Sequence, residues 1–108
     1  MKASIVIPVW NGREHLRACL DAVLAQDNPS FEAIAVDNGS RDGSDEFVVE
    51  NYPSVRLIRN ESNLGFAGGC NVGLRAAEGD VLVLLNQDVI VRSGWLSALM
   101  RGLEEPQV

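Results

Sequence analysis

The sequence lacks the long apolar runs, cysteine frameworks and basic clusters that mark several common classes of protein. Its longest apolar stretch covers residues 81–85, which is far too short to cross a bilayer. The two cysteines, Cys19 and Cys70, have no metal-binding spacing, so we expect two reduced thiols. Lys and Arg number 9 against 15 Asp and Glu, and no basic run exists. Nucleic acid is therefore excluded as an expected partner, because phosphate neutralisation needs clustered cations.

Signals for export and for the common phosphate-binding loops are also missing. The chain passes from Met1 into an apolar run within a few residues, without the pattern of a signal peptide, which predicts a cytoplasmic protein. No Gly-Lys-Ser/Thr exists, which excludes a Walker A loop, and the first turn lacks the glycines of a nicotinamide-binding fold. Only one lysine, Lys2, is present, and the first run ends without an acidic pair, so a response-regulator-like phosphoacceptor is disfavoured.

What the chain does have is a regular alternation of short apolar runs with helical patterns. This alternation predicts βαβ units and an open α/β fold, with a mostly parallel sheet and helices on both faces, in one Rossmann-like domain spanning residues 1–108. Right-handed crossovers predict the strand order third-second-first-fourth, which places a topological switch point between the first and fourth strands. The expected strands cover residues 4–9, 33–36, 55–58 and 81–85, and the expected helices about 16–26, 43–51, 65–78 and 95–103.

Each apolar run ends in a polar cluster. In a parallel sheet these clusters lie at one edge, where ligands of open α/β sheets bind. We therefore expect Asn11, Asp37 and Asp88 to converge around one crevice. Asp37 can accept hydrogen bonds from a ribose or a base N–H. The alternative is that Asp37 only caps its own loop, and for Ser40 and Asp42 helix capping is the expected role.

Asp88 follows a buried strand, which is a poor place for a carboxylate that serves solubility alone. With a carbonyl oxygen from Asn86 it can hold Mg²⁺ or Mn²⁺ on a diphosphate, the alternative being a turn Asp bonded to local backbone. Trp10 can stack on a ligand or plug its loop. Asn11, three residues before Glu14, also predicts a capping box at the first helix.

A glycine-rich segment, residues 63–71, opens the third expected helix. Such entries present backbone N–H groups and the positive end of a helix dipole, which suit phosphates. The interior glycines, Gly68, Gly69 and Gly73, each cost about 1 kcal/mol relative to alanine, so they indicate close approach to the sheet or to a ligand.

Together the clusters resemble the amino-terminal, nucleotide-sugar-binding part of the family-2 glycosyltransferases with the GT-A fold. The matching segments are residues 6–11, the expected helix 16–26, residues 36–44, Asn60 with residues 63–73, and residues 84–88, in order and covering nearly the whole chain. The run Asn-Leu-Gly-Phe-Ala-Gly-Gly at residues 63–69 most resembles the rhamnosyltransferase-like branch.

The resemblance implies specific roles at the cleft. It assigns the nucleotide pocket to Pro8 and Asn11, and the base or ribose to Asp37. It places Asn63, Gly65 and Asn71 beside the nucleotide and donor sugar. Asp88 matches the last residue of the family's Asp-x-Asp motif, which holds the divalent metal, whereas Asn86 replaces its first Asp and leaves the strength of metal binding open.

The resemblance also implies transfer to an acceptor hydroxyl of a glycan or lipid-linked glycan, in cell-surface polysaccharide synthesis at the inner face of the membrane. Family members continue into an acceptor-binding half that carries the catalytic base, and nothing after Asp88 matches that base. We therefore expect a truncated or naturally short glycosyltransferase whose catalytic residue is unknown. The alternative is an inactive nucleotide-sugar-binding or structural module. Apolar surface left by a missing half favours a homodimer.

Overall fold

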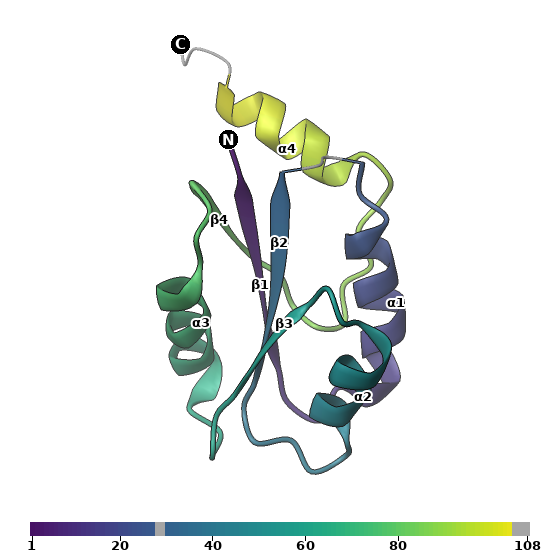
Figure 1. Ribbon diagram of the computed structural model, residues 1–108, viewed down its shortest axis with the longest axis vertical. Helices are drawn as coiled ribbons and strands as arrows, with labels where there is room; N and C mark the ends of the chain where they lie inside the picture. Colours follow the sequence, from purple (N-terminus) through teal and green to yellow (C-terminus); the bar gives the residue numbers. More distant parts are fainter. Residues whose placement is uncertain (28–29, 105–108) are drawn as a thin grey trace.

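Strands and helices alternate along the whole of the chain that the computed structural model describes, residues 1–27 and 30–104 (Figure 1). None of the helices in these two segments combines the length and the apolar character needed to cross a membrane. The elements are β1 (Ala3–Val9), α1 (Arg13–Leu24), β2 (Phe31–Asp37), α2 (Ser44–Asn51), β3 (Arg56–Arg59), α3 (Gly65–Ala76), β4 (Val81–Leu84) and α4 (Trp95–Glu104).

The four strands form one parallel sheet in the order β3-β2-β1-β4, which confirms the predicted order and fold class. Pairing of β1 with β2 runs from Ala3 opposite Phe31 to Val9 opposite Asp37. Pairing of β1 with β4 stops earlier, at Val6 opposite Leu84. The last part of β1 therefore has β2 on one side and no ladder with β4 on the other.

Helices cover both faces of the sheet, and alternate residues of β1 face each layer. Ile5 and Ile7 pack in one core cluster with residues of α1, α2 and α4, whereas Val6 packs in a second cluster with Ile34 and with residues of α3 (Figure 1). Ile5, Val6, Ile7 and Ile34 are completely buried, because the central strands have a helical layer on either side.

The glycine-rich face of α3 allows this helix to lie close to the sheet. A Cβ placed on Gly73 would lie 2.3 Å from Cγ1 of Val6 and 3.0 Å from Cγ2 of Val36. A Cβ on Gly69 would lie 2.5 Å from the Asn38 side chain. The predicted close approach to the sheet is confirmed at Gly73.

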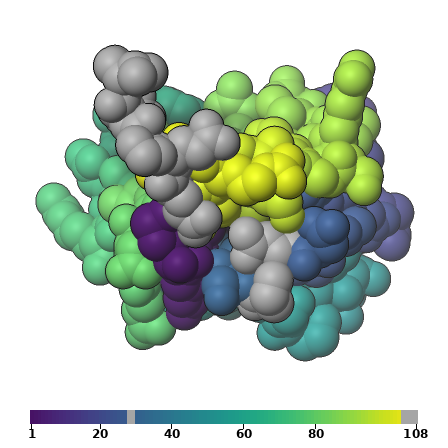
Figure 2. Space-filling view, turned by 90° about the horizontal axis from the view of Figure 1, so that it is seen from above, coloured from purple at the N-terminus to yellow at the C-terminus, as the bar shows by residue number. Residues whose placement is uncertain are grey.

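Helix α4 lies at the end of the sheet where β1 begins. Figure 2, seen from above, shows α4 in yellow beside the purple start of β1. Gln26 fixes this helix: its Nε2 donates to the carbonyl oxygen of Arg92 at 2.9 Å, and its Oε1 accepts from the N–H of Leu96 at 3.0 Å. The carboxyl edge of the strands, at the opposite end, is left free of this packing.

The start of α1 differs from the predicted capping box. Its N-cap is Gly12, without a side-chain cap, and Asn11 adopts a positive φ of 47° that turns its side chain toward the next loop. There Asn11 Oδ1 accepts the N–H of Arg41 at 2.8 Å. Capping is supplied by Asp42, which accepts N–H groups from Arg13 at 3.1 Å and Ser44 at 3.0 Å, so the capping predicted for Asp42 is confirmed.

Candidate functional site

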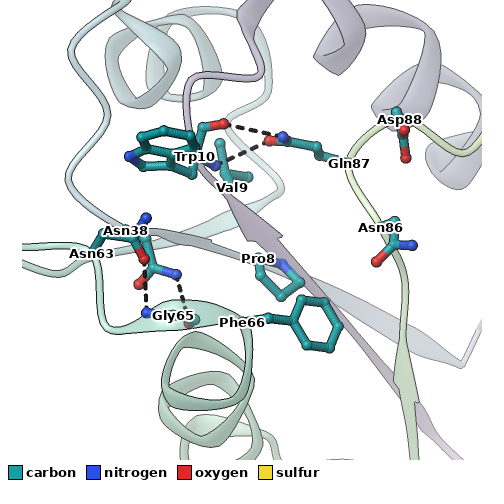
Figure 3. A pocket seen from close by; sticks show the side chains of 10 residues that line it. All are labelled: Pro8, Val9, Trp10, Asn38, Asn63, Gly65, Phe66, Asn86, Gln87 and Asp88. Atoms are coloured by element: carbon teal, nitrogen blue, oxygen red, sulfur yellow. Dashed lines mark hydrogen bonds between the residues drawn. The ribbon is translucent and has the colours of Figure 1, made fainter.

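A cleft of about 370 Å³ opens at the predicted switch point, between the end of β1, the segment after β4 and the start of α3 (Figure 3). Its position follows from the early end of the ladder between β1 and β4. The last backbone bond between these segments joins the N–H of Leu85 to the carbonyl oxygen of Val6 at 2.9 Å. The lining residues are Pro8, Val9, Trp10, Asn38, Asn63, Gly65, Phe66, Asn86, Gln87 and Asp88.

One wall of the cleft carries side-chain oxygen atoms that can bind a metal ion. The exposed side chains of Asn86 and Asp88 both line it, and carboxylate and amide oxygens suit Mg²⁺ or Mn²⁺. Within residues 1–27 and 30–104, no group of three His, Cys, Asp or Glu side chains is placed to hold a metal ion. This donor set fits a metal that takes its remaining ligands from a diphosphate and water, and does not fit a site made of protein ligands alone.

A buried thiol lies close to this wall without lining the cleft. Cys19 of α1 is fully buried and its Sγ lies 3.8 Å from the carbonyl oxygen of Asn86. Burial, and secondarily the negative charge of Asp88, raise the pKa of the Cys19 thiol to about 11. The thiol is therefore protonated at neutral pH and is not a nucleophile.

The opposite wall is the start of α3, held by asparagine side chains. Asn63 Oδ1 accepts the N–H of Gly65 at 2.7 Å, and Asn38 Nδ2 donates to the carbonyl oxygen of Gly65 at 3.2 Å. Asn60 Nδ2 in turn donates to Asn38 Oδ1 at 2.8 Å. These bonds fix the amino end of a helix at the cleft, where its N–H groups and dipole favour an anionic ligand.

A second hollow, of about 500 Å³, adjoins the cleft. Trp10 and Asn63 line both, so they form the boundary between them. The Trp10 side chain is 52% exposed, which leaves its ring accessible to a ligand. The second hollow is lined by Trp10, Asn11, Gly39, Arg41, Glu61, Ser62 and Asn63.

Asp37 lies outside both hollows, which corrects the expectation that Asn11, Asp37 and Asp88 share one crevice. Asp37 is buried, and its Oδ2 accepts the N–H of Ser40 at 3.1 Å, so its own loop holds the carboxylate. Its Oδ1 is buried without a hydrogen-bond partner among the described residues. An unsatisfied buried acceptor is costly, and at the end of a strand in a binding edge it fits a ligand N–H or O–H.

The structure thus brings most predicted site residues together in the cleft and leaves three outside it: Asp37, Asn11 and Asn71. Asn11 lines only the second hollow, because its positive φ turns it toward Arg41. Asn71 lies on the exposed surface of α3 and lines neither hollow, since it is more than a turn beyond the start of that helix. The predicted residues that line the cleft are Pro8, Asn63, Gly65, Asn86 and Asp88.

Four lining residues were not predicted from the sequence. Asn38 belongs to the polar cluster after β2, and that cluster was the available signal for it. Phe66 is next to the predicted Gly65, and its 59% exposure is unusual for a phenylalanine. Gln87 belongs to the polar cluster after β4, which was the available signal for it, whereas Val9 gave no signal because its place in the cleft depends on how far two strands diverge.

The chain is similar to known glycosyltransferases along nearly its whole length. The family model "Glycosyl transferase family 2" matches residues 4–108. Glycosyltransferase GlyG of Streptococcus pneumoniae serotype 4 is 30% identical over 106 residues, which is 94% of this chain and 35% of that protein. Glycosyltransferase AglE of Haloferax volcanii is 32% identical over 98 residues, which is 86% of this chain and 32% of that protein.

Solved structures share the fold closely. The mannosyltransferase PcManGT from Pyrobaculum calidifontis, in complex with GDP-Man and Mn²⁺, matches with a TM-score of 0.91 and 26% identity over 99% of this chain and 33% of that one. S. aureus TarS 1-349, in complex with UDP-GlcNAc, matches with a TM-score of 0.88 and 26% identity over 96% and 31%. The chain spans about a third of the length of these relatives.

The match to the family covers the sheet, the cleft and the helices on both faces. This chain belongs to glycosyl transferase family 2 and shares the α/β fold of the GT-A glycosyltransferases.

Proposed function

We propose that the cleft between β1 and β4 binds the nucleotide-diphospho-sugar donor of a glycosyltransferase. The observation that carries this proposal is the juxtaposition, in one cleft, of the Asp88 carboxylate with the amino end of α3. A divalent cation on one side and helix N–H groups on the other complement a diphosphate. Relatives of the same fold have UDP-GlcNAc, or GDP-Man and Mn²⁺, bound.

Each predicted residue has a proposed role in donor binding. Asp88, assisted by Asn86, holds Mg²⁺ or Mn²⁺; this metal, when bound, stabilises the charge on the departing diphosphate. Asp37 accepts a hydrogen bond from the base or ribose through its free Oδ1. Pro8, Asn11, Asn63, Gly65 and Asn71 border the nucleotide and the donor sugar, Asn71 from the exposed side of α3.

Donor binding and acceptor activation are assigned to different parts of the proposed enzyme. Residues 1–108 form one donor-binding domain, and deprotonation of the acceptor hydroxyl is assigned to residues outside it. This division is supported by the share of the relatives that the chain covers, 35% of GlyG and 32% of AglE.

Calorimetric titration tests the proposal. UDP-GlcNAc and GDP-mannose are titrated with and without Mn²⁺, and we expect Mn²⁺-dependent binding of at least one of them. D88N should abolish the Mn²⁺ dependence, because it removes the only carboxylate lining the cleft. D80N is the matched control: it makes the same charge change at the opposite end of β4, where Asp80 accepts the N–H of Lys2. Absence of binding with every donor would contradict the proposal.

The donor sugar, the acceptor and the location of the protein are proposed from the resemblance to family members. We include a rhamnosyltransferase-like donor among the candidates because of the run at residues 63–69, and dTDP-rhamnose in the titration tests it. The acceptor is a glycan or lipid-linked glycan of cell-surface polysaccharide synthesis. Such an acceptor places the protein in the cytoplasm, peripheral to the inner face of the membrane. Fractionation of cells that produce the tagged protein tests this location.

An inactive nucleotide-sugar-binding module is the competing function, and Asn86 favours it. With an amide in place of the first carboxylate of the metal motif, the cleft has one negative charge fewer with which to hold the cation. Transfer of sugar from a bound donor to any acceptor by this chain would exclude the inactive module. Donor binding without transfer or hydrolysis, under all conditions, would favour it.

A further inference from the structure

The side chain of Gln87 bridges the gap between the two strands that form the cleft. Its Oε1 accepts the N–H of Trp10 at 3.0 Å, and its Nε2 donates to the carbonyl oxygen of the same residue at 3.1 Å (Figure 3). Both backbone groups of Trp10 are thereby bonded to one amide. A neighbouring strand would satisfy such groups in the same manner, with one N–H and one carbonyl oxygen.

This bridge stands where the backbone ladder is absent. The pairing of β1 with β4 ends at Val6 opposite Leu84, and Pro8 has no N–H to continue it. Beyond that point the two segments separate and the cleft opens between them. The Gln87 amide rejoins them past the cleft, so that loop 10–12 and loop 86–88 are held at a set distance.

The neighbouring backbone leaves room for this amide and for little else. Gly12 is buried, and a Cβ placed on it would lie 2.0 Å from Gln87 Oε1. Gly12 has a φ of −105°, which any residue adopts, so its lack of a side chain reflects space and not backbone geometry. The nearest atom is the far end of a flexible side chain, so an alanine at this position displaces the amide at small cost to the fold.

We propose that Gln87 is a positioning residue for the donor: its amide sets the distance between Trp10, on one rim of the cleft, and Asp88, on the other, before the donor binds. The inference rests on the proposed function, because a donor must contact both rims for that distance to matter. Gln87 itself need not touch the donor. Because the two loops are already ordered in the free protein, donor binding does not incur the conformational entropy cost of ordering them, and the affinity is higher.

The test uses two substitutions that remove the bridge from opposite sides. Q87M keeps the length of the side chain and loses both hydrogen bonds, and G12A keeps the glutamine and displaces it. We expect each to weaken the binding of the best donor with Mn²⁺ by about tenfold. G12A should have no further effect on donor binding in a Q87A background, where the space is free. The control is Q26A, which removes a glutamine bonded to three backbone groups at the far end of the sheet and should lower stability without changing the donor Kd.

Amide hydrogen exchange without donor separates this inference from the proposed function. Q87M and G12A should speed exchange of the Trp10 N–H at least tenfold while the most protected amides of β1 and β2 keep their rates. Unchanged Trp10 exchange, or an unchanged donor Kd despite faster exchange, would overturn the positioning role. If the unmodified chain binds no donor while the exchange result is as expected, the proposed function fails and the bridge between the loops is upheld as a feature of the fold alone.

Discussion

At the scale of single residues, Asp37 combines burial with an unsatisfied oxygen. Its Oδ2 is held by the N–H of Ser40, and its Oδ1 has no partner among the described residues. An unpaired buried acceptor lowers the stability of the free protein. The proposed donor binding assigns this oxygen a partner, the N–H or O–H of a base or ribose.

The substitution D37N should separate binding from stability. An asparagine keeps an acceptor for Ser40 and loses the buried charge, so we expect the free energy of unfolding to stay equal or to rise by up to about 1 kcal/mol. The affinity for the nucleotide-sugar should fall by at least about tenfold, because the N–H or O–H group of the base or ribose loses a charged hydrogen-bond acceptor. Urea unfolding and calorimetry measure the two effects.

The control for D37N is D42N. Asp42 accepts N–H groups at the starts of both α1 and α2, so its substitution should lower stability by about 1 kcal/mol and leave the donor Kd unchanged. Loss of stability in D37N, with unchanged donor affinity, would show that Asp37 serves only its loop.

Ionisation of the Cys19 thiol makes the free energy of unfolding depend on pH in the alkaline range. Burial, then the charge of Asp88, raise the pKa of this thiol from 9.0 to about 11, so the folded chain keeps a proton that the unfolded chain releases. The resulting stabilisation is complete below pH 9 and is lost as pH rises toward 11. In C19A the free energy of unfolding should be lower at pH 8, by about 1 kcal/mol for the lost packing, and should fall less steeply above pH 9. Urea unfolding at a series of pH values measures both slopes, and parallel curves would contradict the prediction.

At the scale of secondary-structure elements, α3 shows why glycine is present inside a helix. Gly73 costs helix propensity, yet a Cβ there would collide with Val6 and Val36 of the sheet. The sequence predicted that some other interaction compensates for the low helix propensity of these glycines. At Gly73 the structure shows this compensation, because the missing side chain lets α3 pack close to the sheet.

The pair G73A and G102A tests this explanation. G73A should destabilise the protein by about 1–3 kcal/mol despite a better helix former, because α3 must move away from the sheet. Gly102, in α4, has no atom within 4 Å of a built Cβ, so G102A should stabilise by up to about 1 kcal/mol. Thermal and urea unfolding of both variants provide the comparison, and stabilisation by both would refute the packing explanation.

Elements and their order were predictable from sequence because they depend on local patterns. Apolar runs with turn residues located the strands, and the right-handed crossover rule fixed their order. The contents of the cleft were less predictable. Asn11 turns away because of a positive φ, and Asp37 is held by its own loop, neither of which follows from residue type. Gln87 escaped notice because its partner is backbone, far away in sequence.

At the scale of the whole molecule, the sheet has an uncovered apolar strip along β4. Leu82 and Leu84 are 49% and 45% exposed, on the face that carries α3. Among the described residues, β4 pairs only with β1, so its other edge has backbone groups free for another strand. An apolar edge of this kind favours association.

We propose that two copies of the chain associate through this strip. The apparent mass in light scattering should rise toward a dimer with concentration, and the double substitution L82K with L84K should hold the chain monomeric. V49K, at an exposed apolar site on α2, is the matched control and should leave association unchanged. A monomer at every concentration would refute the homodimer.

The placement of α4 at the amino end of the strands, with Gln26 as its anchor, has a consequence for how this protein can change. The packing of this helix does not depend on the loops at the carboxyl edge of the sheet, so exposed positions in those loops can change without disturbing it. Gly12, Asn38 and Asp42 are not among these positions, because they are buried or hold the starts of helices. A library confined to the exposed residues Trp10, Arg41, Glu61, Ser62 and Asn86 should retain a high fraction of folded members, and it tests whether these positions alone change the preferred donor.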